Sequence, residues 1–197
     1  MFPINIHTSK SNLCFVDLLS RGRSTIQTSW DGSINPWKFE AALAIDPENI
    51  FLIGKGFSKK PLKPSQTISK YFEGLWEHEV IEFFFAVEDS KYIEYHLAPD
   101  GLWWGHSFTA PRVRSKNFAI PAVEIHDSTL TDGWVTILKI RREDLLGDLA
   151  GSVAKINITA TFRGETPPHA SLAILGGEKP NFHQPEKFIP VDTNLFT

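Results

Sequence analysis

The stretch from Ser152 to Arg163 alternates strictly between apolar and polar residues, and this pattern limits the possible folds more than any other feature of the chain. Because successive side chains of a β-strand point to opposite faces, a period of two indicates a strand with one buried and one polar face. The apolar positions are Ala154, Ile156, Ile158, Ala160 and Phe162, and the polar positions are Lys155, Asn157, Thr159, Thr161 and Arg163. The sequence therefore predicts a sheet with one face in a hydrophobic core.

Short strand signals recur along the rest of the sequence, separated by Gly, Pro and Asp turn residues. Helical patterning is scarce, with Arg141–Leu149 as the only fair candidate, and the polar segment 59–70 is expected to be a surface loop. Further strands are expected within 8–20, 33–46, 49–57, 79–88, 91–108 and 134–140. We therefore predict an all-β fold, an antiparallel β-sandwich with jelly-roll-like topology and little helix, forming a single domain over residues 1–197.

The composition supports a globular protein and argues against two kinds of partner. Hydrophobic residues make up 42% of the 197 residues, which is enough for a packed core. The net charge of −3 and the lack of a basic stripe argue against nucleic acid as a partner. No apolar run approaches the roughly 18 to 20 residues of a membrane-spanning helix. We therefore expect neither nucleic-acid binding nor membrane insertion.

The sequence has one cysteine, Cys14, so no intrachain disulfide can form. Its apolar neighbours predict an inert thiol in the core. The first ten residues lack the basic and apolar regions of a secretory signal, which favours a cytoplasmic location unless a signal peptide has been removed.

The segment 75–85 places carboxylates and an indole beside a run that resembles a buried strand. If this strand pairs as a hairpin with the next one, Glu82, Glu94 and His96 point to the same polar face. The polar residues of the strand at 152–163 join them if both strands lie in one sheet. Such a face is either a solvated surface with cross-strand ion pairs or a concave platform for a sugar. The residues alone leave both interpretations open.

Glu82 is expected to point away from the core, on the face opposite Ile81. Phe84 shares the face of Glu82, so this carboxylate needs hydrogen-bond donors under partial cover. Because side chains alternate along each strand, His96 and Arg163 are expected on the same face as Glu82, as the nearest hydrogen-bond donors to its carboxylate.

Motifs for other chemistries are not evident in the sequence. The histidines show no spacing typical of paired metal ligands, and no serine lies in a G-x-S-x-G turn. The glutamates give no reason to prefer a glycosidase pair. We therefore expect no metal, no cofactor and no enzymatic activity.

Four stretches resemble motifs of DOMON-like domains related to family 9 carbohydrate-binding modules. They are LWEHEVIEFFF at 75–85, YIEYHLAPDGLWWGHSF at 92–108, Pro111-Arg112 with Arg114, and GGEKPNFHQPEKF at 176–188. Their order and spacing match the family from Trp37 to Phe188. The resemblance implies a β-sandwich that binds the end of a glycan chain. In that family the terminal sugar lies between two tryptophans, with Glu, Arg and Asn side chains beneath.

The resemblance implies Trp76 as the stacking ring and Glu79 or Glu82 as the acceptor for sugar hydroxyl groups. Glu94 and His96 lie where the family places polar sugar contacts on the next strand. The complete predicted ligand-binding set is Trp76, Glu79, Glu82, Glu94, His96, Trp103, Trp104 and Arg163.

The second tryptophan of the family has no direct counterpart, because this chain has HASLAILGG where the family often has an aromatic residue. Trp103 or Trp104 is therefore the candidate for the second ring. The segment 181–183 is expected to be structural, with Phe182 in the core and His183 hydrogen-bonded to the backbone.

The expected function is non-catalytic binding of a saccharide, as the end of a glycan chain, on the polar face of one sheet. A first alternative is a cytoplasmic interaction or scaffold domain that has lost its ligand. A second is a haem-binding DOMON-type domain. Met1 is the only methionine, so a haem would need two histidine ligands.

Overall fold

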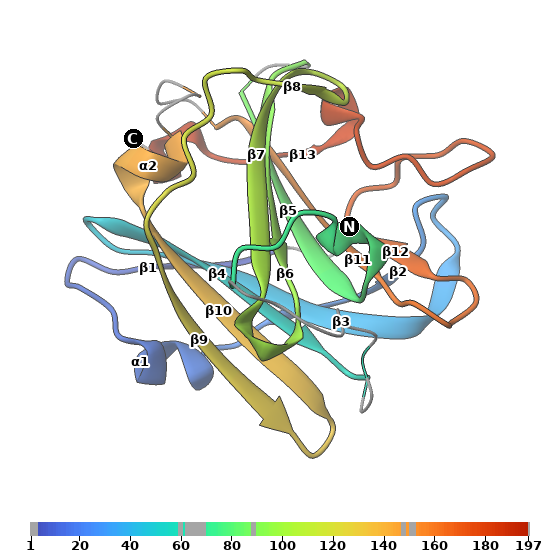
Figure 1. Ribbon diagram of the computed structural model, residues 1–197, viewed down its shortest axis with the longest axis horizontal. Helices are drawn as coiled ribbons and strands as arrows, with labels where there is room; N and C mark the ends of the chain where they lie inside the picture. Colours follow the sequence, from blue (N-terminus) through green and yellow to red (C-terminus); the bar gives the residue numbers. More distant parts are fainter. Residues whose placement is uncertain are drawn as a thin grey trace.

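The protein is described by a computed structural model that covers residues 4–58, 61, 70–87, 90–146, 149 and 153–196. Its strands form two packed β-sheets, in which almost all neighbouring strands are antiparallel (Figure 1). The predicted all-β sandwich with little helix is confirmed, whereas the jelly-roll-like topology stays a prediction. The loop predicted at 59–70 falls mostly outside the described residues.

The first sheet has the strand order β1-β3-β4-β10-β9, and β2 pairs with β3. The pairing of β1 with β3 is parallel, and the others are antiparallel. The strands are β1 (Asn5–Thr8), β2 (Ser24–Thr28), β3 (Ile34–Ile45), β4 (Asn49–Gly56), β9 (Val123–Leu130) and β10 (Gly133–Arg141).

The second sheet has the strand order β12-β11-β5-β6-β7-β8, and β13 pairs with β11. The strands are β5 (Val80–Ala86), β6 (Tyr92–Leu97), β7 (Trp103–Ala110), β8 (Val113–Arg114), β11 (Lys155–Thr161), β12 (His169–Ser171) and β13 (Ile189–Pro190). The alternating segment at 152–163 contains β11, which pairs with β5, so both strands do lie in one sheet.

Helical segments in the described part of the chain are few and short. They are α1 (Phe15–Leu19), α2 (Arg142–Leu146) and the 3-10 turns η1 (Leu75–Glu77), η2 (Pro99–Gly101), η4 (Pro185–Lys187) and η5 (Thr193–Phe196). The helix expected at 141–149 is confirmed as α2, but α1 replaces the strand expected within 8–20. Cys14 precedes α1 and is exposed, so the prediction of a buried thiol is wrong. No helix among the described residues is long and apolar enough to cross a membrane.

The main hydrophobic core lies between the two sheets. Alternate residues of β3 and β5 enter it, such as Phe39 and Leu43 from the first sheet and Ile81 and Phe83 from the second. The indole of Trp134 packs directly over Gly56, where a Cβ atom would lie only 2.3 Å from the indole nitrogen.

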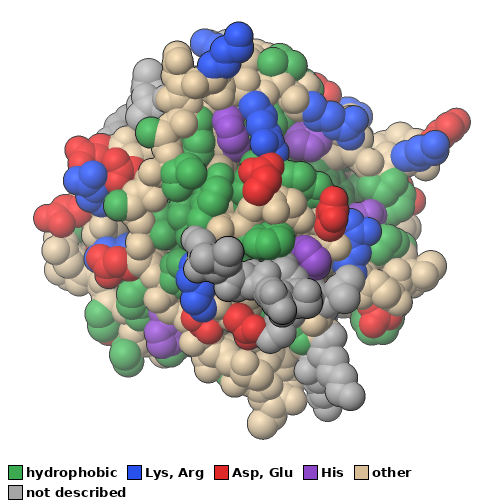
Figure 2. Space-filling model, in the orientation of Figure 1, with side chains coloured by type: hydrophobic (Ala, Val, Ile, Leu, Met, Phe, Trp, Pro, Cys, Tyr) green, Lys and Arg blue, Asp and Glu red, His purple; other side chains and the backbone are tan. Residues whose placement is uncertain are grey.

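The outer face of the second sheet carries a second hydrophobic cluster that includes Phe84, Tyr92, Trp104 and Phe108. The C-terminal segment covers part of this face, with Phe188 packed into the same cluster. Figure 2 shows apolar, acidic, basic and His side chains gathered together in the middle of the molecule in this view. This outer face is therefore a partly covered surface on which polar groups are embedded among aromatic rings.

Candidate functional site

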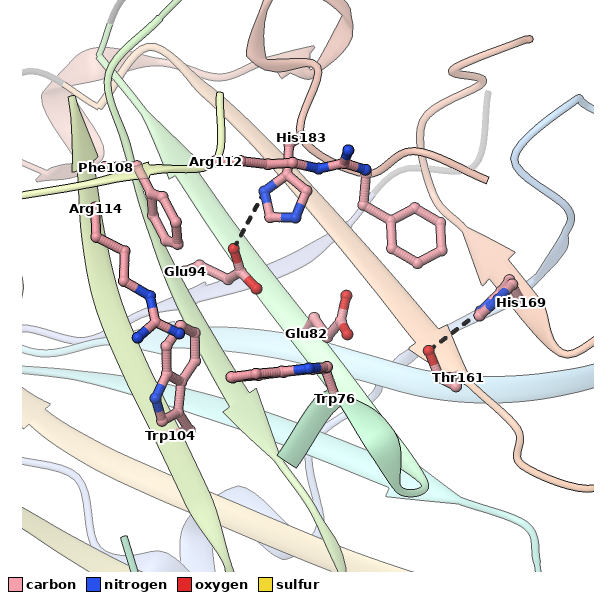
Figure 3. A pocket seen from close by; sticks show the side chains of 11 residues that line it. Trp76, Glu82, Glu94, Trp104, Phe108, Arg112, Arg114, Thr161, His169 and His183 are labelled. Carbon is pink, nitrogen blue, oxygen red and sulfur yellow. Dashed lines mark hydrogen bonds and ion pairs between the residues drawn. The ribbon is translucent and has the colours of Figure 1, made fainter. Parts of the chain in front are cut away.

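A pocket of about 330 Å³ opens on the outer face of the second sheet. It combines aromatic rings with carboxylate, guanidinium and imidazole groups from β5, β6, β7, β8, β11, β12 and the segments between them (Figure 3). Its lining residues are Trp76, Glu82, Glu94, Trp104, Phe108, Arg112, Arg114, Thr161, His169, Phe182 and His183. We call this cavity the outer-face pocket.

Strand register brings two carboxylates and an imidazole together at the floor of the pocket. Glu82 on β5 is the register partner of His96 on β6, and Glu94 lies two residues before His96 on the same strand. His96 Nε2 lies 2.5 Å from Glu94 Oε1 and 4.0 Å from Glu82 Oε1. Glu82 Oε2 accepts a 2.7 Å hydrogen bond from the hydroxyl group of Thr159 on β11. All three floor residues are buried.

Burial controls the protonation of the floor residues. It raises the pKa of Glu94 to about 7, although His183 and Arg114 act in the opposite direction. Burial also raises the pKa of Glu82 and lowers the pKa of His96. The floor thus contains a neutral imidazole and a carboxyl group that changes its protonation near neutral pH. Such groups can both donate and accept hydrogen bonds.

An aromatic wall forms one side of the pocket. Trp76 lies in η1 with 36% of its surface exposed, and its ring packs edge to face against Trp104, with ring centroids 5.3 Å apart. The Arg114 guanidinium lies over both indoles, 5.0 Å from the Trp104 ring and 5.6 Å from the Trp76 ring. Glu73 accepts hydrogen bonds of 2.7 Å from both the Trp104 indole and Arg114. These contacts hold the wall while leaving Trp76 partly exposed.

Arg112 and His183 lie across the pocket from the aromatic wall (Figure 3). Arg112 has a positive φ of 63°, which is unusual for a residue with a side chain. Its backbone N–H donates to the Tyr92 hydroxyl group at 3.2 Å, and its guanidinium donates to Asn181 Oδ1 at 3.1 Å. His183 Nδ1 lies 2.7 Å from the same Tyr92 hydroxyl group. Tyr92 and Asn181 thus orient both basic residues.

Five of the eight residues predicted from the sequence meet at this pocket. Trp76, Glu82, Glu94 and Trp104 line it, and His96, which is not itself a lining residue, contacts Glu94 and Glu82 beneath them. Arg163 lies just beyond it, where the guanidinium donates a 2.9 Å hydrogen bond to the backbone carbonyl of Trp76.

Glu79 and Trp103 do not line the pocket, because they face the core between the sheets. Glu79 accepts a 2.7 Å hydrogen bond from the Trp134 indole. Trp103 packs edge to face on Tyr71 and belongs to the main core. The alternation of side chains along a strand explains both positions. Residue 79 lies just before β5, two residues from Ile81, and so points to the same side as Ile81. Trp103 and Trp104 are neighbours on β7 and so face opposite ways.

Two predicted contacts are corrected by the structure. Glu82 points away from the main core as expected, but its hydrogen-bond donor is Thr159 rather than His96 or Arg163. His183 contacts the side chain of Tyr92 rather than the backbone expected for it. Phe182 is only partly buried and packs against the outer-face cluster, where it lines the pocket, rather than lying in the main core.

The predicted set missed several lining residues, among them Arg112, Arg114, His169 and His183. The two arginines and His183 lie in stretches that carry the family resemblance, so the resemblance could have identified them as site residues. His169 carries no such signal, and its ring nitrogen lies 3.2 Å from the Thr161 hydroxyl group.

No protein-family model and no curated protein sequence matches this chain. Solved structures do match its fold. A candidate carbohydrate-binding protein from Bacteroides uniformis has a TM-score of 0.65 at 17% identity, and the match covers 94% of this chain and 97% of the other. Two structures of a family 9 carbohydrate-binding module from Caldicellulosiruptor kristjanssonii match as well.

The family 9 module in complex with cellotriose has a TM-score of 0.57 at 8% identity, over 95% of this chain and 92% of the module. The module in complex with glucose has a TM-score of 0.58 at 8% identity, over 94% of this chain and 93% of the module. At these identities the likeness shows that this chain has the fold of these proteins.

Proposed function

We propose that this chain binds a saccharide in the outer-face pocket without transforming it. The observation that carries the proposal is a partly exposed indole, Trp76, beside the buried carboxylates Glu82 and Glu94. A sugar ring presents C–H groups on its faces and hydroxyl groups at its edge. The pocket offers a ring for the first and hydrogen-bonding groups for the second.

The size of the pocket favours a small ligand or the end of a longer one. Its volume of about 330 Å³ lies at the low end of the range of about 300–1,000 Å³ for small-molecule sites. We therefore propose the terminal part of a glycan chain as the ligand. The terminal sugar lies against Trp76, and its hydroxyl groups reach Glu82, Glu94 and Arg112.

The fold supports the same proposal. The neighbours solved with glucose and with cellotriose are family 9 carbohydrate-binding modules. A relationship of this chain to those modules and to DOMON-like domains, which the four sequence motifs indicate, is part of the proposal.

Isothermal titration calorimetry with a panel of neutral mono- and oligosaccharides, including glucose and cellotriose, tests the proposal. We expect saturable binding of at least one of them to the wild-type chain and loss of binding in Trp76→Ala. Trp37→Ala is the matched control, because Trp37 lies on β3 with 37% of its surface exposed. Absence of binding across the panel would favour the interaction or scaffold domain that has lost its ligand.

A further inference from the structure

The floor of the outer-face pocket holds a cluster with the composition of a metal site. Glu82, Glu94 and His96 each offer one ligand atom, and these atoms lie within 4.8 Å of one another. All three side chains are at least nine-tenths buried, with exposed fractions of 4%, 4% and 1%. This distinguishes the cluster from the exposed acidic groups that are common on protein surfaces.

Two buried atoms of this cluster lack hydrogen-bond partners among the described residues. Glu94 Oε2 accepts no hydrogen bond, and His183 Nδ1 approaches it only to 3.6 Å. His96 Nδ1 is also without a partner. Buried polar atoms in native proteins are almost always satisfied by protein, water or an ion. The orphaned carboxylate oxygen, on a residue that lines the pocket, therefore indicates a missing group.

The charges at the floor also indicate a cation. Two carboxylates held this close in a buried site repel each other, and each is costly to bury in its ionised form. The partners that the structure gives them are the Thr159 hydroxyl group, the imidazole of His96 and, 3.6 Å from Glu94, the imidazole of His183. The arginines of the pocket are engaged elsewhere, Arg114 with Glu73 and Arg112 with Asn181.

We propose that Glu82, Glu94 and His96 form a binding site for a divalent first-row transition metal, with zinc as the best fit. One imidazole nitrogen and two carboxylate oxygens suit zinc, which is commonly held by three protein ligands with a further position open. Calcium fits less well, because it takes about six to eight oxygen ligands. Two of the three ligands, Glu82 and Glu94, line the outer-face pocket.

The present geometry is close to that of a zinc shell. Metal–ligand distances of about 2.0–2.2 Å place tetrahedral ligand atoms roughly 3.3 Å apart. The distances of His96 Nε2 to Glu94 Oε1 and to Glu82 Oε1, 2.5 and 4.0 Å, lie on either side of this value. Coordination therefore requires His96 Nε2 to lie farther from Glu94 Oε1 and nearer to Glu82 Oε1 than it does here.

Metal binding requires that Nε2 of His96 carries a lone pair. In the neutral imidazole the single proton moves from Nε2 to Nδ1, and the latter nitrogen has no hydrogen bond to break among the described residues. Any proton held by the glutamates passes to the buffer when the metal binds. The ring stays neutral, the carboxylates become ionised, and no redox change is involved.

The test uses the full chain after removal of metals with a chelator and dialysis. Titration with zinc, followed by calorimetry, should show one ion bound per chain with release of protons to the buffer. Glu94→Gln and His96→Gln should each weaken zinc binding at least about tenfold, since even the loss of a supporting residue costs about that much. Glu79→Gln is the matched control, because Glu79 is a buried carboxylate just before β5 that accepts a hydrogen bond from Trp134 on the core side.

Thermal melting gives a second readout and reports whether each variant folds. Zinc should raise the melting temperature of the wild-type chain and of Glu79→Gln, but not that of folded Glu94→Gln or His96→Gln. Equal zinc binding by all four proteins, no zinc binding by the wild type, or a clear preference for calcium would each overturn the proposal. The proposal does not depend on sugar binding, so a zinc-binding chain that ignores every saccharide would remove only the proposed function.

Discussion

Trp76 and Trp104 pack edge to face at 5.3 Å, yet Trp76 is 36% exposed and Trp104 is almost fully buried. The exposed ring is available to a ligand, whereas the buried ring supports it and donates a hydrogen bond to Glu73. This division of roles within one pair of rings leads to separate expectations for binding and for stability.

We predict that Trp76→Ala abolishes saccharide binding with little loss of stability, because the ring is partly in solvent. Trp104→Ala should lower the free energy of unfolding by about 3–5 kcal/mol, as for other buried large aromatic residues. Thermal or urea unfolding, combined with calorimetry, separates the two effects. A strongly destabilised Trp76→Ala variant with unchanged saccharide affinity would show that this ring is structural.

Arg112 combines a strained backbone with a side chain aimed over the pocket. Both Arg112→Gly and Arg112→Ala remove the guanidinium and should weaken saccharide binding. Glycine relieves the positive φ, whereas alanine keeps it, so the glycine variant should be the more stable by about 1 kcal/mol. Urea denaturation measures this difference, and equal stability of the two variants would contradict the observed backbone conformation.

The raised pKa of Glu94 predicts a pH dependence of stability in the metal-free protein. The ordinary pKa of this carboxyl group is 4.5, and burial raises it to about 7 in the folded chain. Between these pH values the folded state binds more protons than the unfolded state, so stability falls as pH rises. The contribution is fully present below pH 4.5 and is lost as pH passes through about 7.

Glu94→Gln should remove this dependence, because glutamine does not titrate. The difference in unfolding free energy between the variant and the wild type should change by at most about 1.4 kcal/mol per pH unit within the window. Urea denaturation of both proteins at intervals from pH 4 to pH 8 measures it. Parallel profiles for the two proteins would show that Glu94 titrates normally.

Glu79 is predicted to contribute to stability and not to binding. Glu79→Ala leaves the buried Trp134 indole nitrogen without its acceptor, which should cost about 1–3 kcal/mol. Glu79→Gln keeps a carbonyl acceptor and should cost less. Saccharide affinity should be unchanged in both variants by calorimetry, and a loss of affinity in the folded Glu79→Gln variant would contradict the inward orientation.

Strand periodicity predicted the part of the site that lies on the sheet. Glu82, Glu94, His96 and the polar residues of β11 share one face because alternation is a local property of extended backbone. The same rule places Glu79 and Trp103 on the inner face, and these two were included in the site from the resemblance alone. For a candidate residue on a strand, the face to which its side chain points thus predicts membership of the site better than the family resemblance does.

The remaining parts of the site depend on contacts that local patterns do not encode. Arg112 and Arg114 reach the pocket because the chain turns back after β7 to form the short strand β8. His183 is placed by packing of the C-terminal segment on the sheet, 91 residues from its partner Tyr92. The cluster of Glu82, Glu94 and His96 likewise arises from the register between β5 and β6, and the spacing of histidines along the sequence does not indicate it.

An NMR titration of the tryptophan indole N–H signals tests saccharide binding at Trp76 most directly. The protein is labelled with ¹⁵N and titrated with the saccharide that binds most tightly in the calorimetric panel, and the spectrum of Trp76→Ala identifies the Trp76 signal. We predict that the Trp76 and Trp104 signals shift and saturate together, while the signal of Trp134, buried against Glu79, stays in place. A Trp76 signal that does not move at saturation, or shifts confined to Trp37, would contradict the proposed site.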